Sequence, residues 1–316
     1  MLSSVVRRIL SAIPTLLIVS IVLFIMMNIL PGDATLNAAL NGADEAYMQR
    51  LRADMGLDQP AHIRYLNWLA GFFRGDLGRS LVTQTPVSTM LMQRLPVTLE
   101  LTFLAMIISV VIAIPLGILS AMKRNTPIDW IGSTVSMLGV AAPSFWMGIL
   151  LILIFAVNLH WLPASGFTAF AKDPVMNLKR MIMPAFSIGL AFTATVMRQT
   201  RSAMLEVINQ DYVTTAYSKG IPNSRVIWKH ALRNALIPVL TVVSTQIGRL
   251  IGGAVVCEQV FALPGIGRQI VDGILSRDYP VVMGLIMVVA ALVILINTVV
   301  DVLYIIIDPR ISHSKK

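Results

Sequence analysis

The sequence predicts an all-α integral membrane protein with about six transmembrane helices. Of its 316 residues, 56% are hydrophobic and only 13% are charged, whereas a soluble domain carries about 25% charged residues. The apolar residues form six long runs, and each is long enough to cross a hydrocarbon core about 30 Å thick as a helix. The runs are Ile9–Leu30, Val97–Met122, Ile131–Val157, Met181–Met197, Leu236–Val256 and Val281–Ile307.

The first run follows Arg7 and Arg8, an arrangement that also occurs at the start of signal peptides. The run is too long for an ordinary signal sequence and five further runs follow, so we interpret it as a first span that is retained. With the N-terminus inside, the inside segments hold thirteen Lys and Arg residues and the short outside loops hold five. The positive-inside rule therefore predicts that both termini are cytoplasmic, although Lys179 and Arg180 precede the fourth run on the outside.

Several function classes are excluded by the composition and by missing motifs. The net charge of +9 does not indicate nucleic-acid binding, because the basic residues lie between the apolar runs, as membrane topology favours. Cys257 is the single cysteine, which excludes a disulfide within one chain and a cysteine metal cluster. The sequence has no Gly-Lys dipeptide, hence no Walker A loop, and neither a His-Glu-x-x-His nor a Gly-x-Ser-x-Gly motif. We therefore predict no enzyme activity, no catalytic or metal-binding residues and no cofactor in this chain.

The segment of residues 198–238, between the fourth and fifth runs, predicts a cytoplasmic helical hairpin with a net charge of +4. Its first helix contains Tyr212, Val213, Ala216 and Tyr217 on one side at helical spacing. Asn209 or Asp211 is a candidate cap for its start, and Gly220 followed by Pro222 predicts its end. A second helix is expected over Arg225–Ala235, capped by Asn223 or Ser224. Physical reasoning alone leaves two roles open, an amphipathic loop on anionic lipid and a docking surface for a soluble partner.

This hairpin resembles the coupling loop of binding-protein-dependent ABC importer permeases, and more specifically that of the dipeptide/oligopeptide family with its glutathione and nickel branches. The resemblance rests on DYVTTAYSKG and HALRNALIP in the loop and on further motifs in family order along nearly the whole chain. Thr214, Thr215 and Ala216 occupy the places of the Glu-Ala-Ala of the general family pattern and differ from it at the first two, and Tyr217 stands where a small or basic residue is more usual. The further motifs are LPGD (Leu30–Asp33), GLDQP (Gly56–Pro60), GDLGRS (Gly75–Ser80), LPGIGR (Leu263–Arg268), RDYPVV (Arg277–Val282) and DPR (Asp308–Arg310).

The resemblance implies a type I ABC importer permease in a bacterial inner membrane, surrounded by lipid. It implies three kinds of protein partner: a second homologous permease, two ATPase subunits that use ATP and Mg, and an extracytoplasmic substrate-binding protein. Di- and oligopeptides lead the expected substrates, and glutathione, nickel and metallophores stay open. The residues that it assigns to ATPase coupling are Asp211, Tyr212, Thr215, Ala216, Tyr217, Gly220, His230, Arg233 and Asn234.

Arg249 lies within the fifth run beside Gln246, and charged residues inside membrane spans are often functional. We name both as candidates for the translocation pathway. A structural ion pair of Arg249 with Glu100, with Asp301 or with a partner subunit is the alternative. Because Glu100 and Asp301 fall near the ends of their runs, we expect both to reach the membrane interface.

We divide the chain into residues 1–30 (tail and first helix), 31–95 (extracytoplasmic segment), 96–310 (permease core with the coupling loop) and 311–316 (cytoplasmic tail). Segment 31–95, with Trp68, Phe72 and Phe73, is either a docking surface for the binding protein or a loop that packs on its own helices. The turn-rich loop Gln259–Asp278 is a candidate gate. A secondary transporter or channel that works without ATP is the alternative function, but the spans offer few of the buried carboxylates or histidines that ion coupling uses.

Overall fold

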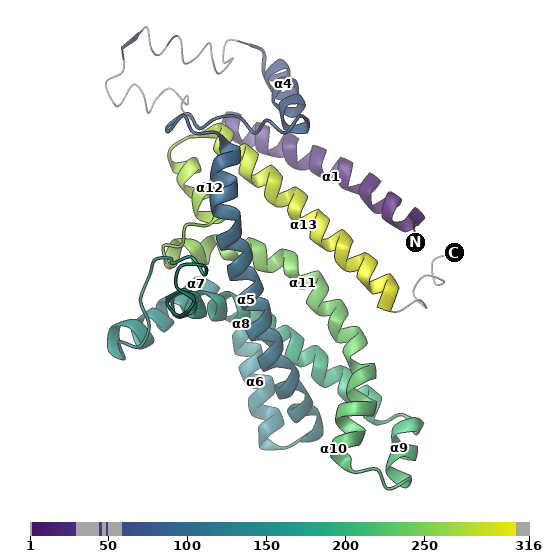
Figure 1. Ribbon diagram of the computed structural model, residues 1–316. Helices are drawn as coiled ribbons and strands as arrows, with labels where there is room; N and C mark the ends of the chain where they lie inside the picture. Colours follow the sequence, from purple (N-terminus) through teal and green to yellow (C-terminus); the bar gives the residue numbers. More distant parts are fainter. Residues whose placement is uncertain (1, 30–43, 46–48, 50–58, 308–316) are drawn as a thin grey trace. The chain divides into compact units, whose positions relative to one another are not determined.

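The computed structural model describes residues 2–29, 44–45, 49 and 59–307 (Figure 1). Over those ranges the chain is helical, and its single β feature is an isolated bridge between Arg79 and Pro86. The all-α prediction is therefore confirmed. The elements are α1 (Leu2–Ile29), α4 (Ala61–Phe73), α5 (Val87–Met122), α6 (Pro127–Ala141), α7 (Ser144–Leu151), the π-helix η1 (Ile152–Asn158), α8 (Pro174–Ile208), α9 (Asp211–Ser218), α10 (Asn223–Arg225), the π-helix η2 (Val226–Ala231), α11 (Leu232–Val260), α12 (Ile266–Leu275) and α13 (Tyr279–Ile307).

Five helical stretches within the described residues are long and apolar enough to cross a membrane, and a bent pair brings the number to six. At 1.5 Å per residue, the 36 residues of α5 and the 35 of α8 span about 54 and 52 Å. Both helices are thus longer than a hydrocarbon core of about 30 Å, so their ends extend beyond it. The five stretches are Leu10–Ile29, Val87–Met122, Pro174–Ile208, Asn223–Val260 and Tyr279–Val300.

The third apolar run, Ile131–Val157, was expected to cross the membrane as one helix, but it is sharply bent. The run is divided into α6 and the pair α7–η1, which meet at 106°. The break lies at Ala142 and Pro143: Ala142 is extended at φ −73° and ψ 123°, the region to which a following proline restricts a residue. Hydropathy along a sequence reports apolar length but not direction, so it could not reveal this bend.

The first of two compact units combines the chain up to Val97 with Pro264–Thr298. Its core contains Leu77, Val87 at the start of α5, and residues of α12 and α13. Two of the sequence motifs meet here, because the Asp278 carboxylate accepts hydrogen bonds from the Ser80 hydroxyl and, at 3.1 Å, from the backbone N–H of Leu81. GDLGRS is thereby attached to the start of α13.

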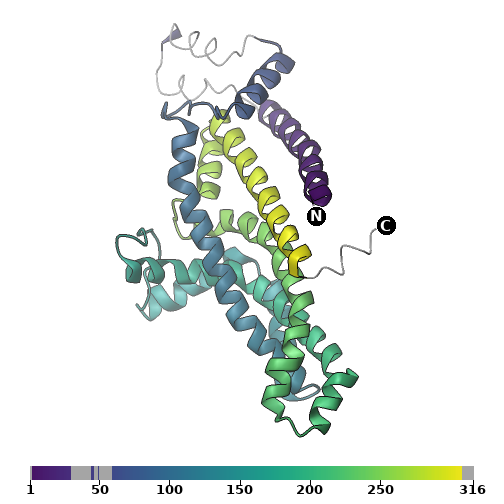
Figure 2. The same cartoon turned by 45° about the vertical axis from the view of Figure 1, so that its right-hand side comes forward.

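The second unit runs from Thr98 to Leu263, with the end of α13 from Val299. Helix α8 is its centre and packs against α6, α7 and α11. Figures 1 and 2 show the C-terminal part of α5 beside α6. Close backbone approach between α5 and α8 is marked by Ser109, whose hydroxyl donates to the carbonyl of Gly189 at 2.8 Å. This unit contains both the hairpin and the pathway candidates.

Candidate functional site: a helical hairpin joined to a charged pocket

Helix α9 forms the first arm of the predicted hairpin and ends at the glycine that the sequence indicated. Gly220 has φ +75°, in the left-handed region that favours glycine. Its N–H donates to the carbonyl of Tyr217 at 2.9 Å, and the N–H of Ile221 donates to that of Ala216 at 3.3 Å. These two bonds form a Schellman motif, which satisfies the last carbonyls of the helix. The expected cap at the start is wrong, since Gln210 occupies the N-cap position without a side-chain hydrogen bond.

The second arm is not a separate helix over Arg225–Ala235, as expected, but the beginning of a continuous helix from Asn223 to Val260. Neither Asn223 nor Ser224 caps it, because Pro222 is the N-cap residue. The π-helical turn η2 lies in this arm. The buried residues of the arm and its continuation are Val226, Ile227, Ala231, Ala235 and Val239. A π-turn of this kind frequently marks a functional segment.

Figures 1 and 2 show α9 beside the second arm, and a small apolar core and two tyrosines hold the two arms together. Val213 and Ala216 of α9 pack against Val226 of the second arm. The hydroxyl of Tyr217 donates to the Asn223 Oδ1 at 2.8 Å. At the other end of α9, the Asn234 Nδ2 donates to the Tyr212 hydroxyl at 2.7 Å. The hairpin is therefore a self-supporting element rather than a pair of loose helices.

The residues expected to couple to an ATPase do not all occupy the same environment. Ala216 is buried in the small core that holds the hairpin together, and His230 is half-buried. The others present their side chains or backbone on its surface. These exposed residues are Asp211, Tyr212, Thr215, Tyr217, Gly220, Arg233 and Asn234. Trp228, 56% exposed on the second arm, was missed by the sequence reasoning.

A buried ion pair, also missed from the sequence, ties α6 to α8 two turns before α8 ends. Arg201 donates from Nε and Nη2 to the two carboxylate oxygens of Asp129, at 2.6 and 2.7 Å. Asp129 is only 4% exposed. It accepts two further hydrogen bonds, from the Ser120 hydroxyl at 2.5 Å and from the backbone N–H of Asn125 at 3.0 Å. One carboxylate thus joins the end of α5, the start of α6 and α8.

Gln246 and Arg249, the two pathway candidates, line the same pocket of about 280 Å³. Arg249 Nη1 donates to Gln246 Oε1 at 3.3 Å, one turn earlier on α11. The pocket wall comes from α6, α7, α8 and α11. Its lining residues are Val140, Ser144, Ile188, Ala191, Phe192, Thr195, Gln246, Arg249, Leu250 and Gly253.

The proposed pairing of Arg249 with Glu100 is not what the structure contains. Glu100 lies inside α5, which begins at Val87, and its reach to the membrane interface stays a prediction. One of its carboxylate oxygens is buried without a hydrogen-bond partner among the described residues. The side chain of Asp301 lies outside the described part, so the pairing of Arg249 with Asp301 stays a prediction.

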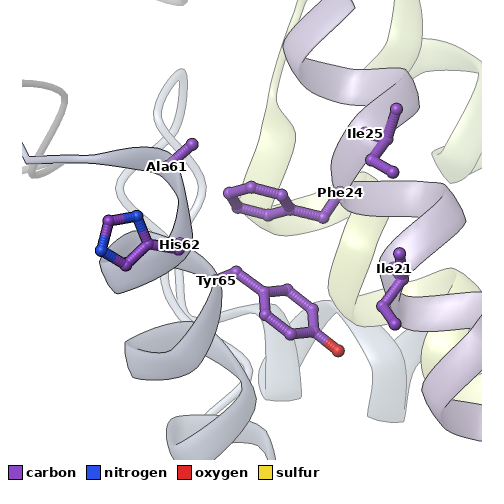
Figure 3. Close-up of a pocket in the computed structure, with 6 residues that line it drawn as sticks. All are labelled: Ile21, Phe24, Ile25, Ala61, His62 and Tyr65. Atoms are coloured by element: carbon purple, nitrogen blue, oxygen red, sulfur yellow. The ribbon is translucent and has the colours of Figure 1, made fainter.

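A second pocket, of about 200 Å³, lies in the first unit between α1 and α4 (Figure 3). Phe24 of α1 and Tyr65 of α4 point toward each other across it, with ring centroids 5.4 Å apart. The Tyr65 hydroxyl also hydrogen-bonds Ser20 at 2.8 Å, and Trp68 packs against the same part of α1. The described part of segment 31–95 therefore packs on its own helices, and docking of a binding protein there stays a prediction.

Two family signatures match nearly the whole sequence. The binding-protein-dependent transport system inner membrane component matches residues 113–313, and the N-terminal part of such membrane components matches residues 1–102. The chain belongs to this family. The family match confirms the resemblance seen in the sequence. It also confirms the function class: the chain is a membrane permease subunit of an ABC importer, a transport component of the inner membrane.

Relatives of this permease match it from end to end. It is 43% identical, over 99% of its length, to the whole of a putative peptide transport system permease protein of Brucella suis. It is 40% identical, with the same coverage, to an oligopeptide transport system permease protein of Bacillus subtilis and to a glutathione transport system permease protein of Salmonella typhimurium. A crystal structure of an amino acid ABC transporter with histidines shares the fold, with a TM-score of 0.50 and 16% identity over 71% of this permease and 94% of that chain.

Proposed function

We propose that this permease, with a second homologous permease, forms the translocation pathway of an importer for peptides or related small solutes. The substrate class is supported by the relatives, which are named for peptide, oligopeptide and glutathione transport. An extracytoplasmic binding protein delivers the solute, and two ATPase subunits on the cytoplasmic side hydrolyse ATP with Mg. No observation favours the alternative of a transporter that works without ATP.

One observation carries the mechanism: the two helices that lead into the hairpin also line the pocket. Helix α8 contributes Ile188 and Phe192 to the pocket and continues to α9. The continuous helix from Asn223 to Val260 carries Arg233 in the hairpin and Arg249 in the pocket. These two arginines are about 24 Å apart along the helix axis. If the hairpin moves as a rigid body, the two pocket walls formed by α8 and α11 therefore move with it.

The surface of the hairpin suits a protein partner better than a lipid surface. Its apolar side chains, Val213, Ala216 and Val226, face each other and are buried. Tyr212, Tyr217 and Trp228 are exposed, but the other exposed residues of the second arm are polar and basic, so the surface of the hairpin is mixed rather than uniformly apolar. A lipid-bound amphipathic helix needs a continuous exposed apolar face. We therefore assign the hairpin to docking in a groove of the ATPase subunits.

In this mechanism the chain itself performs no covalent chemistry. Closure of the ATPase dimer on ATP moves the hairpins, and α8 and α11 transmit the movement to the pathway as a hinge or rigid-body transition. The Arg201–Asp129 ion pair makes α6 follow α8, because the two helices share one desolvated contact. Three of the four helices around the pocket then respond together, which is what alternating access requires.

The proposal is tested by co-purification of the tagged permease, expressed with its genomic neighbours and extracted in mild detergent. We expect a second permease and ATPase subunits to purify with it. Gly220→Pro should lose the ATPase and keep the second permease, because proline cannot adopt φ +75° and removes an N–H of the Schellman motif. Gly75→Pro is a matched control, since Gly75 has φ +84° and lies outside the hairpin.

The outcomes separate the parts of the proposal. Retention of the ATPase by Gly220→Pro would place the docking surface outside the hairpin. Equal loss with Gly75→Pro would show a general effect of the backbone defect. A native permease that purifies with neither partner would remove the importer assembly itself.

A further inference from the structure

The pocket beside α11 contains one charged side chain, and that charge is positive. Among the residues that line it, Arg249 is the one cation and there is no Asp or Glu. Gln246, Ser144 and Thr195 supply polar groups, and the rest of the lining is apolar. The hydroxyl of Thr195 donates to the carbonyl of Ala191 in its own helix, at 2.9 Å, so its oxygen is left mainly as an acceptor.

Arg249 has no counter-ion in the described part of the chain. Its guanidinium is exposed in the pocket and has a single side-chain hydrogen bond, to Gln246 at 3.3 Å. Arg201 of α8, in contrast, is bound by both oxygens of a carboxylate. A cation within a membrane span is costly unless it faces an anion or water. The remaining N–H groups of Arg249 therefore point to an anionic partner from outside the chain.

The geometry of a guanidinium narrows the chemistry of that anion. Its planar N–H groups match the two oxygens of a carboxylate in a bidentate contact, which is stronger and more directional than a contact with an ammonium group. The Gln246 amide holds one edge of the group, which leaves another edge open to the pocket. The apolar wall formed by Ile188, Phe192 and Leu250 gives room for the uncharged part of a small molecule.

We propose that Arg249, positioned by Gln246, binds the carboxylate of the transported solute during passage. This inference rests on the proposed function and narrows its substrate class to solutes with a free carboxylate, such as peptides with an unmodified C-terminus. At about 280 Å³ the pocket is near the small end of ligand sites, which span about 300–1,000 Å³. It therefore fits the terminal part of a peptide, and the second permease contributes the rest of the pathway.

The test compares uptake of one dipeptide with a free C-terminus and the same dipeptide with a C-terminal amide. The complete complex, with its binding protein, is reconstituted in vesicles that contain ATP on the ATPase side. The measured quantity is the acid-to-amide ratio of initial uptake rates. Since the same binding protein is present in every sample, its own preference cancels when a variant is compared with the native permease.

Arg249→Gln should lower this ratio about tenfold. The free-acid dipeptide loses its ionic, bidentate contact with Arg249, whereas the amidated dipeptide loses almost no interaction. Arg249→Lys should restore part of the ratio, since it keeps the charge without the planar group. Arg74→Gln removes one exposed positive charge from a residue that does not line the pocket, and its ratio should equal that of the native permease.

Each other outcome has one meaning. An unchanged ratio in Arg249→Gln, with uptake still dependent on ATP, overturns the carboxylate site and leaves the proposed function intact. Loss of the second permease from purified Arg249→Gln overturns it too, because Arg249 is then a subunit contact. Absence of ATP-dependent uptake of both dipeptides by the native complex contradicts the peptide import on which this inference rests.

Discussion

Arg201 of α8 binds both carboxylate oxygens of Asp129, the third residue of α6. Asp129 accepts four hydrogen bonds within 3.0 Å. A negative charge in the first turn of a helix is also stabilised by the helix dipole. Removal of either partner leaves the other charge unpaired and largely desolvated. We therefore expect this pair to stabilise the packing of α6 on α8 more than a surface ion pair would.

We predict that Asp129→Asn destabilises the permease by about 3 kcal/mol, the low end of the range for a broken buried ion pair, because Arg201 is partly exposed. Arg201→Met should have a similar effect. The double variant should cost clearly less than the sum of the two, since it leaves no unpaired charge. Thermal unfolding of the purified complex measures all three. Additive losses would show that the two residues act independently.

This ion pair shows what a single sequence does not reveal. Asp129 and Arg201 are 72 residues apart, and Arg201 counted in the sequence only as one of many basic residues in an inside loop. The helical hairpin, in contrast, follows from local signals: a short amphipathic pattern, a glycine and a proline within ten residues. Local backbone chemistry is readable from sequence, whereas pairing between distant helices depends on the fold.

The second prediction concerns Gly220, where the backbone requires the left-handed conformation. No atom lies within 4 Å of a Cβ built on Gly220, so a substitution is limited by backbone strain and not by space. Asn tolerates this conformation, Ala costs about 1–2 kcal/mol there, and Pro cannot adopt it. Retention of the ATPase during purification should therefore fall in the order Gly, Asn, Ala, Pro. Equal retention by Asn and Pro variants would contradict the role of this conformation.

The third prediction uses two glycines whose surroundings differ. A Cβ on Gly117 of α5 would lie 2.7 Å from the backbone oxygen of Met197 and from the Cβ of Thr200, both on α8. Gly117→Ala should destabilise the complex by about 1–3 kcal/mol, because the two helices must move apart. Gly252→Ala is the matched control, since no atom of the chain lies within 4 Å of its Cβ. The comparison is made by the unfolding temperatures of the two purified complexes. An equal loss would show that close approach of α5 and α8 is not the cause.

The errors of the sequence-based expectations share a physical origin. A hydropathy run reports where a helix is apolar, not where it begins or turns. The second arm was separated from the fifth span because Arg233 and Asn234 are polar, yet the helix continues through both. The same limit applies to α5, which starts at Val87, ten residues before the second apolar run. Helix ends that extend beyond the membrane have the composition of loops.

The last prediction concerns Glu258, a fully buried carboxyl group on α11. The hydroxyl of Thr98 donates to its Oε1 at 2.6 Å. Thr98→Val keeps the shape of the side chain but removes this donor, which should cost about 1–3 kcal/mol because the buried carboxyl group loses a hydrogen bond that water cannot replace. Thr102, one turn along α5, is nearly as buried, but its hydroxyl donates to the carbonyl of Thr98 in its own helix. Thr102→Val should therefore cost less than about 1 kcal/mol. Equal unfolding temperatures for the two variants would mean that the contact between Thr98 and Glu258 adds nothing to the packing of α5 and α11.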